Sequence, residues 1–399
     1  MKFPIAEKLL LTLGVAALAV GFGTSQHFYK SAMLSIFFGF TLASIVLIHL
    51  RVRPSWMDGA LVLAGGAFFT LIDFGVLHFR PSVAGVASFL GITSLTILGL
   101  RVIWSEGDEQ KRMLYVFVPS LLFVCSDWAS VLFLTWTERA HPNVLDLYLV
   151  SFDASLGVQI PFVIGRLFER MTWLKSVSMD FYIGLPLVIA LVYSGQLLRD
   201  RKKAISAMTA FLITGPIGVL FYNLFPALGP VHIFLERFPQ QPFTTAEAAK
   251  LFLEPIAIPG LRNALPSLHM AWVLLAWWYS RKLSVWERGI ALAFVFFTGL
   301  ATVGSGEHYF IDLVVAFPFA VFLLGLTEFS LRRNDRARLG AVVFGLVATL
   351  GWIAALRFSV HTFWVSPALP WVCCIATIAV AIYIQGRSEG ASDGVVLHH

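Results

Sequence analysis

The chain has 399 residues, of which 58% are hydrophobic and only 13% are charged, and its mean hydropathy is +0.80. Soluble proteins carry roughly 25% charged residues, so this composition excludes a chain built from soluble domains. Long stretches almost without charge, such as 9–23, 60–77 and 339–356, are typical of bilayer-spanning helices. The sequence therefore predicts an all-α, polytopic membrane protein.

Apolar runs between polar breaks predict about twelve transmembrane helices. Two longer polar stretches, 137–175 and 225–265, interrupt them. Segment 144–164, within the first stretch, is predicted to lie along the membrane surface as an amphipathic helix, with Asp153 as a cap. The second stretch is predicted to be a loop. The predicted spans lie near 8–25, 31–50, 58–78, 83–103, 113–136, 176–198, 204–224, 266–280, 289–305, 307–328, 340–357 and 364–384.

The distribution of basic residues predicts the orientation in the membrane. When the spans are threaded alternately, 19 of the 29 Lys and Arg residues fall on one side, including the clusters 199–203 and 332–338. The positive-inside rule makes that side cytoplasmic, with both termini there. Stretches 137–175 and 225–265 then face outward. The excess of Lys and Arg over Asp and Glu is therefore explained by orientation in the membrane, and we expect no nucleic-acid partner.

Cysteine usage argues against disulfides and metal sites. The three cysteines, Cys125, Cys373 and Cys374, all lie inside apolar runs. No cluster of His, Cys, Asp and Glu has the spacing of metal ligands, so we expect no metal and no cofactor. No cleavable signal peptide is evident, and segment 9–23 is interpreted as part of the first span.

Two histidines at the predicted outer ends of helices carry the candidate chemistry. His269 lies in Arg-Asn-Ala-Leu-Pro-Ser-Leu-His (262–269), and His308 lies in Glu-His-Tyr-Phe-Ile-Asp (307–312). Pro266 fits the first turn of a helix, where its missing N–H is harmless. The free backbone N–H groups at such a helix start, from Ser267 onward, form a natural anion site.

The spacing of these residues favours nucleophilic catalysis. His308 and Asp312 are four residues apart and would share one face of a helix. A carboxylate there can hold the imidazole in one tautomer and leave the other ring nitrogen free as a nucleophile. His269 could act as the general acid for a leaving group. Arg262 is a candidate phosphate ligand, since a guanidinium matches phosphate oxygens in a bidentate manner.

Pro-Ser-Leu-His at 266–269, followed 39 residues later by His-Tyr-Phe-Ile-Asp at 308–312, resembles the type 2 phosphatidic acid phosphatase superfamily. The strings Phe-Asp-Ala-Ser-Leu-Gly (152–157) and Phe-Pro-Ala-Leu-Gly-Pro (225–230) are similar to its inositol phosphorylceramide synthase-like branch. That branch transfers phosphoryl head groups between lipids. The resemblance covers roughly residues 145–328.

The resemblance implies a division of the chain into three parts. Residues 1–136 would be N-terminal transmembrane helices of unknown role. Residues 137–330 would form a catalytic core of six helices like that of the phosphatidic acid phosphatases. Residues 331–399 would be a C-terminal helix pair and tail.

The resemblance also implies roles for individual residues. His308 would attack phosphorus and form a phosphohistidine, Asp312 would orient His308, and His269 would protonate the departing alkoxide. Ser267 and the adjacent backbone would hold phosphate oxygens.

The chain departs from the phosphatases at their cationic phosphate ligands. Leu268 and Thr302 stand where the phosphatases have Gly and Arg, and their opening Lys-x-x-x-x-x-x-Arg-Pro motif is absent. Arg262 could replace one of the missing cations, and Arg166 or Lys250 another. Asn263, beside Arg262, is a further candidate substrate-binding residue. These departures favour the transferase-like branch.

The sequence predicts an integral membrane lipid phosphotransferase whose site faces the extracytoplasmic side. The donor would be a membrane phospholipid or another lipid phosphate, and the acceptor an alcohol or water. One alternative is a phosphatase acting on a lipid phosphate or an isoprenoid diphosphate. An alternative of another class is a proton-coupled transporter, in which intramembrane histidines and aspartates would carry protons.

Overall fold

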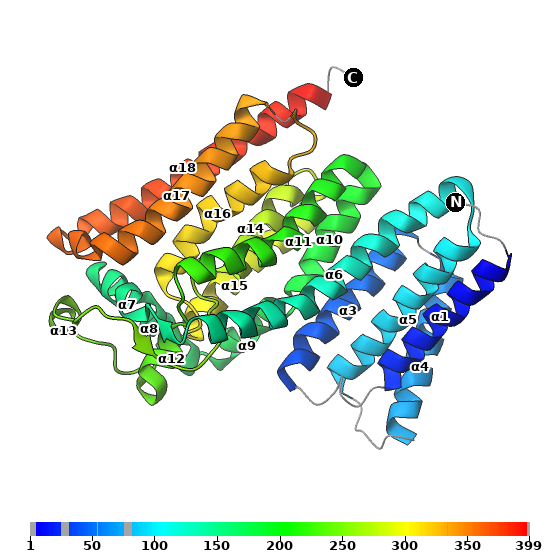
Figure 1. The fold of residues 1–399 in the computed structure, drawn as a ribbon, viewed down its shortest axis with the longest axis horizontal. Coiled ribbons are helices and arrows are strands. Elements are labelled where there is room, and N and C mark those ends of the chain that lie inside the picture. Colours follow the sequence, from blue (N-terminus) through cyan, green and yellow to red (C-terminus); the bar gives the residue numbers. More distant parts are fainter. Residues whose placement is uncertain (1–4, 25–31, 54, 76–81, 333, 397–399) are drawn as a thin grey trace. The chain divides into compact units, whose positions relative to one another are not determined.

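The computed structural model describes residues 5–24, 32–53, 55–75, 82–332 and 334–396, and it is almost entirely helical (Figure 1). Within these residues, eight helices are long and apolar enough to cross a bilayer, or up to ten if each of two bent helix pairs forms one span. The prediction of an all-α polytopic protein is confirmed. The count of twelve spans is not, although a helix is present at each predicted position.

The chain divides into two compact units. The first contains residues 1–129 and 183–200. In this unit α5 packs against α1, α3 and α4, and α10 packs against α3. Helix α6 begins here and passes into the second unit at residue 130. The helices are α1 (Ile5–Thr24), α3 (Ala32–Val52), α4 (Trp56–Gly75), α5 (Val83–Trp104), α6 (Gly107–Ala140) and α10 (Leu185–Arg199).

A buried carboxylate links the helices of the first unit. Asp58 is fully buried, and its oxygens lie 2.6 Å from Nη2 of Arg101, 3.2 Å from Nε of Arg53 and 3.5 Å from Nε2 of His49. The other ring nitrogen of His49 lies 2.8 Å from the Ser94 hydroxyl. Ionisable side chains inside an apolar bundle need such partners, because an unpaired buried charge is strongly unfavourable.

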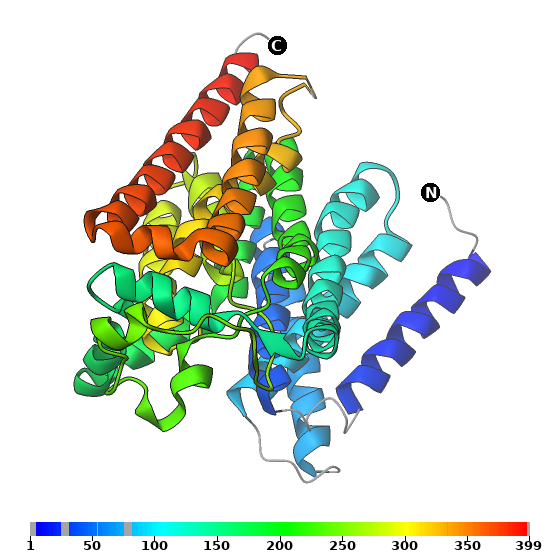
Figure 2. The ribbon, with the colours of Figure 1, turned by 60° about the vertical axis from the view of Figure 1, so that its left-hand side comes forward.

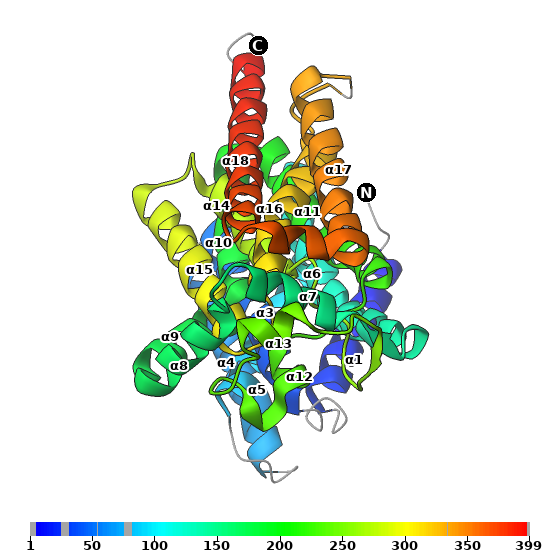
Figure 3. The same cartoon turned by 90° about the vertical axis from the view of Figure 1, so that its left-hand side faces the viewer.

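The second unit contains residues 130–182 and 201–399 and holds both motif histidines. Helix α16 is its centre, since it packs against α11, α14, α17 and α18. Figures 2 and 3 show α17 and α18 running side by side. The helices are α7 (Asp146–Ser155), α8 (Ile160–Arg170), α9 (Thr172–Ile183), α11 (Arg201–Leu224), α12 (Pro230–Phe234), η1 (Leu235–Arg237), α13 (Thr245–Ala249), α14 (Leu268–Ser280), α15 (Val285–Gly304), α16 (Phe310–Thr327), α17 (Arg336–Ser359), η2 (Val360–Val365) and α18 (Ala368–Val396).

The predicted surface helix over 144–164 is wrong. The segment forms two helices, α7 and α8, bent by 85°. Residues 149–155 of α7 are all buried, so α7 lies inside the unit and not along a surface. Helix α8 is amphipathic and packs on α15 through Phe168, which approaches Gly304 so closely that a Cβ there would lie 2.4 Å from the ring.

The predicted loop 225–265 contains only short elements, namely α12, η1, α13 and strand β2 (Ile256–Ala257). Strand β2 pairs antiparallel with β1 (Asn143–Val144), with Val144 opposite Ile256. This ladder joins the two polar stretches that the sequence places on one side of the membrane.

The predicted part boundaries at 136 and 330 do not coincide with the limits of the two units. Helix α10 belongs to the first unit, and α17 and α18 pack on α16 within the second. As functional divisions, the three predicted parts stay predictions.

Candidate active site

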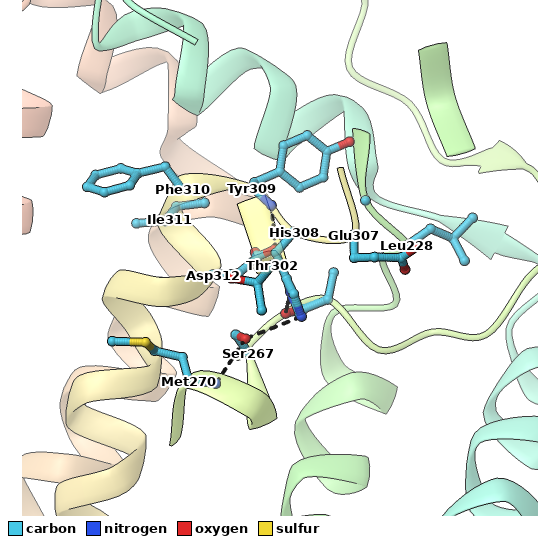
Figure 4. Close-up of polar contacts among 12 residues, drawn as sticks. Leu228, Ser267, Met270, Thr302, Glu307, His308, Tyr309, Phe310, Ile311 and Asp312 are labelled. Carbon is cyan, nitrogen blue, oxygen red and sulfur yellow. Dashed lines mark hydrogen bonds and ion pairs between the residues drawn. The ribbon is translucent and has the colours of Figure 1, made fainter. Parts of the chain in front are cut away.

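His308, drawn in Figure 4, lies in the turn between α15 and α16. Only 2% of its side chain is exposed. Its backbone N–H donates to the Thr302 carbonyl at 3.1 Å. The helix begins at Phe310, so His308 and Asp312 do not share a helix face as predicted. They meet because the Asp312 carboxylate turns back over the helix start, where its Oδ2 accepts from the Tyr309 N–H at 2.8 Å.

The two ring nitrogens of His308 have different partners. Nδ1 lies 3.0 Å from the Ala264 carbonyl oxygen and 3.3 Å from Asp312 Oδ2. Both partners are acceptors, so they favour the tautomer of the neutral ring that has its proton on Nδ1 and its lone pair on Nε2. Nε2 lies 3.2 Å from the Ser267 hydroxyl, toward which the ring turns in Figure 4. This is the arrangement that an attacking imidazole needs.

Ser267 joins the starts of two helices. It is the N-cap of α14, and its Oγ accepts from the Met270 N–H at 3.4 Å. Its own N–H donates to the Asp312 carbonyl at 3.1 Å. Because α14 starts at Leu268, Pro266 precedes the cap and does not occupy the first turn, which corrects the prediction.

His269 lies in the first turn of α14, next to the cap. Its ring stacks on Tyr182 of α9, with centroids 4.1 Å apart and planes 24° apart, and meets Trp272 edge-on at 5.8 Å. His269 follows the N-cap Ser267 by two residues, and the Ser267 hydroxyl lies 3.2 Å from Nε2 of His308. The structure thus brings together four predicted residues from the starts of α14 and α16: Ser267, His269, His308 and Asp312.

Arg262 is not directed at this group in the structure. Its side chain is 1% exposed, and its guanidinium donates to four backbone carbonyls. Its role as a phosphate ligand stays a prediction, and these bonds would have to rearrange before it could bind phosphate. The carbonyls are those of His141 (2.8 Å), Pro142 (2.9 Å), Ile258 (2.9 Å) and Gly260.

The other predicted substrate-binding residues lie apart from the histidines in their described contacts. The Asn263 N–H donates to the Ala227 carbonyl at 3.1 Å. Arg166, on α8, donates from Nη1 to the Pro239 carbonyl at 3.3 Å. Lys250 is exposed at the end of α13. Among the described residues, no hydrogen bond or ion pair joins these three side chains to His308, and their roles stay predictions.

Sequence reasoning missed Asp146, a fully buried residue on α7. Its carboxylate accepts from the N–H groups of Leu228 at 3.1 Å and Gly229 at 2.9 Å, and from the Tyr309 hydroxyl at 3.1 Å. It therefore fixes both the loop before α12 and the residue after His308. The available signal was an acidic residue within an apolar segment, which is by default a functional candidate.

Asp153 was predicted to cap its own segment, and it caps another helix instead. Its two carboxylate oxygens accept from the N–H groups of Phe310 at 2.8 Å and Ile311 at 3.3 Å. These are orphan donors at the start of α16. Asp153 thereby fixes the helix that carries Asp312.

A close backbone approach places a third segment beside His308. Gly229 has φ +144°, and a Cβ there would lie 2.4 Å from the Glu307 carbonyl oxygen. The Val231 N–H donates to the Gly306 carbonyl at 3.0 Å. The Phe225–Pro230 string therefore packs against the turn that holds His308 and helps to fix the position of that turn.

An ion pair lies at the edge of this group. His232 Nε2 and Glu307 Oε2 are 3.7 Å apart, and each side chain is 38% exposed. Interaction with the Glu307 carboxylate raises the pKa of His232, and His232 in turn lowers the pKa of Glu307. Within the described residues, no three His, Cys, Asp or Glu side chains are grouped to hold a metal ion.

The four residues that the structure brings together lie in a segment that matches a protein family. Residues 147–326 match the PAP2 superfamily. The match supports that superfamily and, in general, a lipid enzyme of phosphatase or phosphotransferase type. It suggests lipid phosphate substrates with water or an alcohol as acceptor. No curated protein and no solved structure matches the chain.

Proposed function

We propose that this chain is an integral membrane lipid phosphotransferase of the inositol phosphorylceramide synthase-like branch, acting through a phosphohistidine on His308. The observation that carries the proposal is the asymmetric setting of the His308 ring. Nδ1 is held by Asp312 and the Ala264 carbonyl, and Nε2 faces the Ser267 hydroxyl. The PAP2 match and the sequence motifs support the same chemistry.

In the first step the Nε2 lone pair of His308 attacks phosphorus of the lipid donor. The N–P bond forms, the bond from phosphorus to the leaving oxygen breaks, and His269 protonates the departing alkoxide. In the second step an acceptor alcohol or water attacks phosphorus and breaks the N–P bond, and its proton returns to His269.

The phosphate oxygens would be held by the Ser267 hydroxyl and the backbone at the start of α14. A helix N-terminus attracts anions through its free N–H groups and the helix dipole. Such sites need positioning and charge stabilisation more than a cofactor. This arrangement would compensate for the cations that the phosphatase motifs carry and this chain lacks. We place the site on the extracytoplasmic side, with both termini in the cytoplasm.

Two substitutions test the proposal. His308→Asn should abolish both the release and the transfer of a lipid head group. Asp312→Asn should lower kcat by roughly 10²- to 10⁴-fold, because the ring loses its orienting carboxylate. A covalent phosphorus adduct on the wild-type chain, labile in acid and absent from His308→Asn, should be detectable by mass spectrometry of the trapped enzyme. Full activity of His308→Asn would refute the proposal.

The matched control is His361→Asn, which replaces an exposed histidine on η2. It should retain wild-type turnover and show the same adduct. Product analysis separates transfer from the alternative of a phosphatase, which the PAP2 match also covers. A new phosphodiester lipid indicates transfer, and accumulation of free phosphate indicates hydrolysis. A proton-coupled transporter would be active in transport without any phosphohistidine adduct forming on the wild-type chain.

A further inference from the structure

Glu307 and His232 form a charged pair that the steps above do not use. Glu307 directly precedes His308, yet the partners of the His308 ring are Asp312, Ala264 and Ser267. The pair is 38% exposed, whereas His308 is 2% exposed, so the chain passes from surface to interior within one residue.

The position of the pair is fixed by backbone contacts. Val231, the residue before His232, donates its N–H to the Gly306 carbonyl, and Gly229 lies against the Glu307 carbonyl. The two backbone segments that carry these side chains are therefore held together next to the pair. The pair is therefore more constrained than an ion pair between side chains whose backbones move independently.

The charge of the pair limits what it can bind. A lone carboxylate beside His308 would repel a phosphate, but His232, when protonated, offsets that charge from 3.7 Å away. The pair then offers one strong acceptor and one strong donor side by side. A hydroxyl group matches both, because it donates through O–H and accepts through its oxygen lone pairs.

We propose that His232 and Glu307 bind a second hydroxyl of the acceptor, so that the preferred acceptors are diols or polyols and not alcohols with one hydroxyl. This inference rests on the proposed function. While Glu307 and His232 hold one hydroxyl, the neighbouring hydroxyl oxygen forms the O–P bond, the bond from phosphorus to His308 Nε2 breaks, and the hydroxyl proton moves to His269. Glu307 and His232 act as specificity residues and exchange no proton.

A comparison of two small acceptors, each competing with water, tests the proposed role of His232 and Glu307. The full-length enzyme in vesicles containing phosphatidate is given 1,2-propanediol or 1-propanol, which differ by one hydroxyl. The measured quantity is the ratio of alkyl phosphate to free phosphate, which reports how one phosphoenzyme divides between alcohol and water. Wild type should favour the diol over the monoalcohol by about tenfold, the value of one charge-assisted hydrogen bond.

Glu307→Gln and His232→Gln should each reduce the preference for the diol to within about twofold. The matched control is Glu236→Gln, which removes one exposed negative charge four residues after His232 and should keep the tenfold preference. An unchanged preference in Glu307→Gln and His232→Gln would overturn the inference. Loss of all product in both variants would also overturn it, because the pair would then belong to the donor step.

The proposed function is tested separately in the same experiment. If His308→Asn still forms both products, the phosphohistidine mechanism fails whatever the preference for the diol. If the adduct on His308 forms normally in Glu307→Gln and the preference persists, only the inference about the acceptor fails.

Discussion

His308, the proposed nucleophile, is oriented by two acceptors on one side of its ring. The Ala264 carbonyl and Asp312 Oδ2 both accept from Nδ1, at 3.0 and 3.3 Å, so the tautomer does not depend on one contact. The sequence predicted the Asp312 contact from its spacing. It did not predict the Ala264 carbonyl, because that contact comes from a segment 44 residues away whose path depends on the whole fold.

Arg262 shows how much residue type alone leaves undetermined. A guanidinium close to a histidine motif is typical of a phosphate ligand. In the structure its guanidinium donates to the carbonyls of His141 and Pro142, just before β1, and of Ile258, just after β2. Buried carbonyl groups in loops lack the backbone N–H partners that a helix or sheet supplies, so they need other hydrogen-bond donors. The sequence does not reveal which loops will surround a given arginine.

The pair of His232 and Glu307 predicts a pH dependence of acceptor choice. The pKa of His232 is raised from its ordinary value of 6.5, mainly by Glu307 and also by Asp146, and that of Glu307 is lowered from 4.5, mainly by His232. The contribution of His232 is therefore complete below 6.5 and is lost as pH rises through its raised pKa. The contribution of Glu307 is present above 4.5 and is lost as pH falls through its lowered pKa.

The ratio of diol to monoalcohol product should thus be highest at mildly acidic pH and decline as the solution becomes alkaline. The decline should be absent in His232→Gln, which has no titrating imidazole at this position. Measuring both product ratios from pH 5 to 9, with the Glu236→Gln variant alongside, checks this dependence. A decline of equal size in His232→Gln would assign it to another group.

The start of α16 depends on a carboxylate from a different helix. Asp153 of α7 binds the first two N–H groups of α16. The C-terminal helices support α7 in turn, since Phe363 of η2 packs edge-on against Phe152 at 4.8 Å and Trp364 donates to Ser151 at 3.1 Å. The candidate active site therefore depends on helices outside the motif segment.

Asp153→Ala should destabilise the protein by about 1–2 kcal/mol, the usual effect of losing a helix cap, and should also lower kcat. Asp153→Asn keeps one acceptor oxygen and should lie between wild type and Asp153→Ala in both quantities. Thermal unfolding in detergent and steady-state kinetics measure the two effects.

The matched control is Asp335→Ala, because Asp335 caps α17 through the N–H groups of Ala337 and Arg338. It should lower the unfolding temperature by a similar amount and leave kcat unchanged. If Asp335→Ala and Asp153→Ala reduced kcat equally, Asp153 would have only a general effect on stability.

The long helices were predictable because hydropathy alone decides them, and a helix lies at each of the twelve predicted positions. The short elements were not predictable. Helix α7 reads as a surface helix, yet its acidic residues are buried because Asp146 and Asp153 find backbone donors in distant segments. Boundaries near His308 also shifted, since the cap formed by Asp312, and not hydropathy, sets where α16 begins.

At the scale of the whole molecule, the orientation can be tested by labelling. In a background with Cys125, Cys373 and Cys374 replaced by Ser, an impermeant maleimide should label Lys250→Cys in intact cells. It should label Lys111→Cys only after permeabilisation. Both lysines are exposed, so the comparison depends on the side of the membrane and not on burial. The opposite pattern would place the histidine pair on the cytoplasmic side.

The contacts of α7 also have a consequence during synthesis of the chain. Asp153 and Phe310 are 157 residues apart, and Asp146 and Tyr309 are 163 residues apart. At about 5–20 residues per second, the ribosome needs roughly 10–30 seconds to make α16 after α7 has emerged. For that time both carboxylates lack the donors at the start of α16. The nascent protein must therefore keep α7 hydrated or shielded until translation is nearly complete.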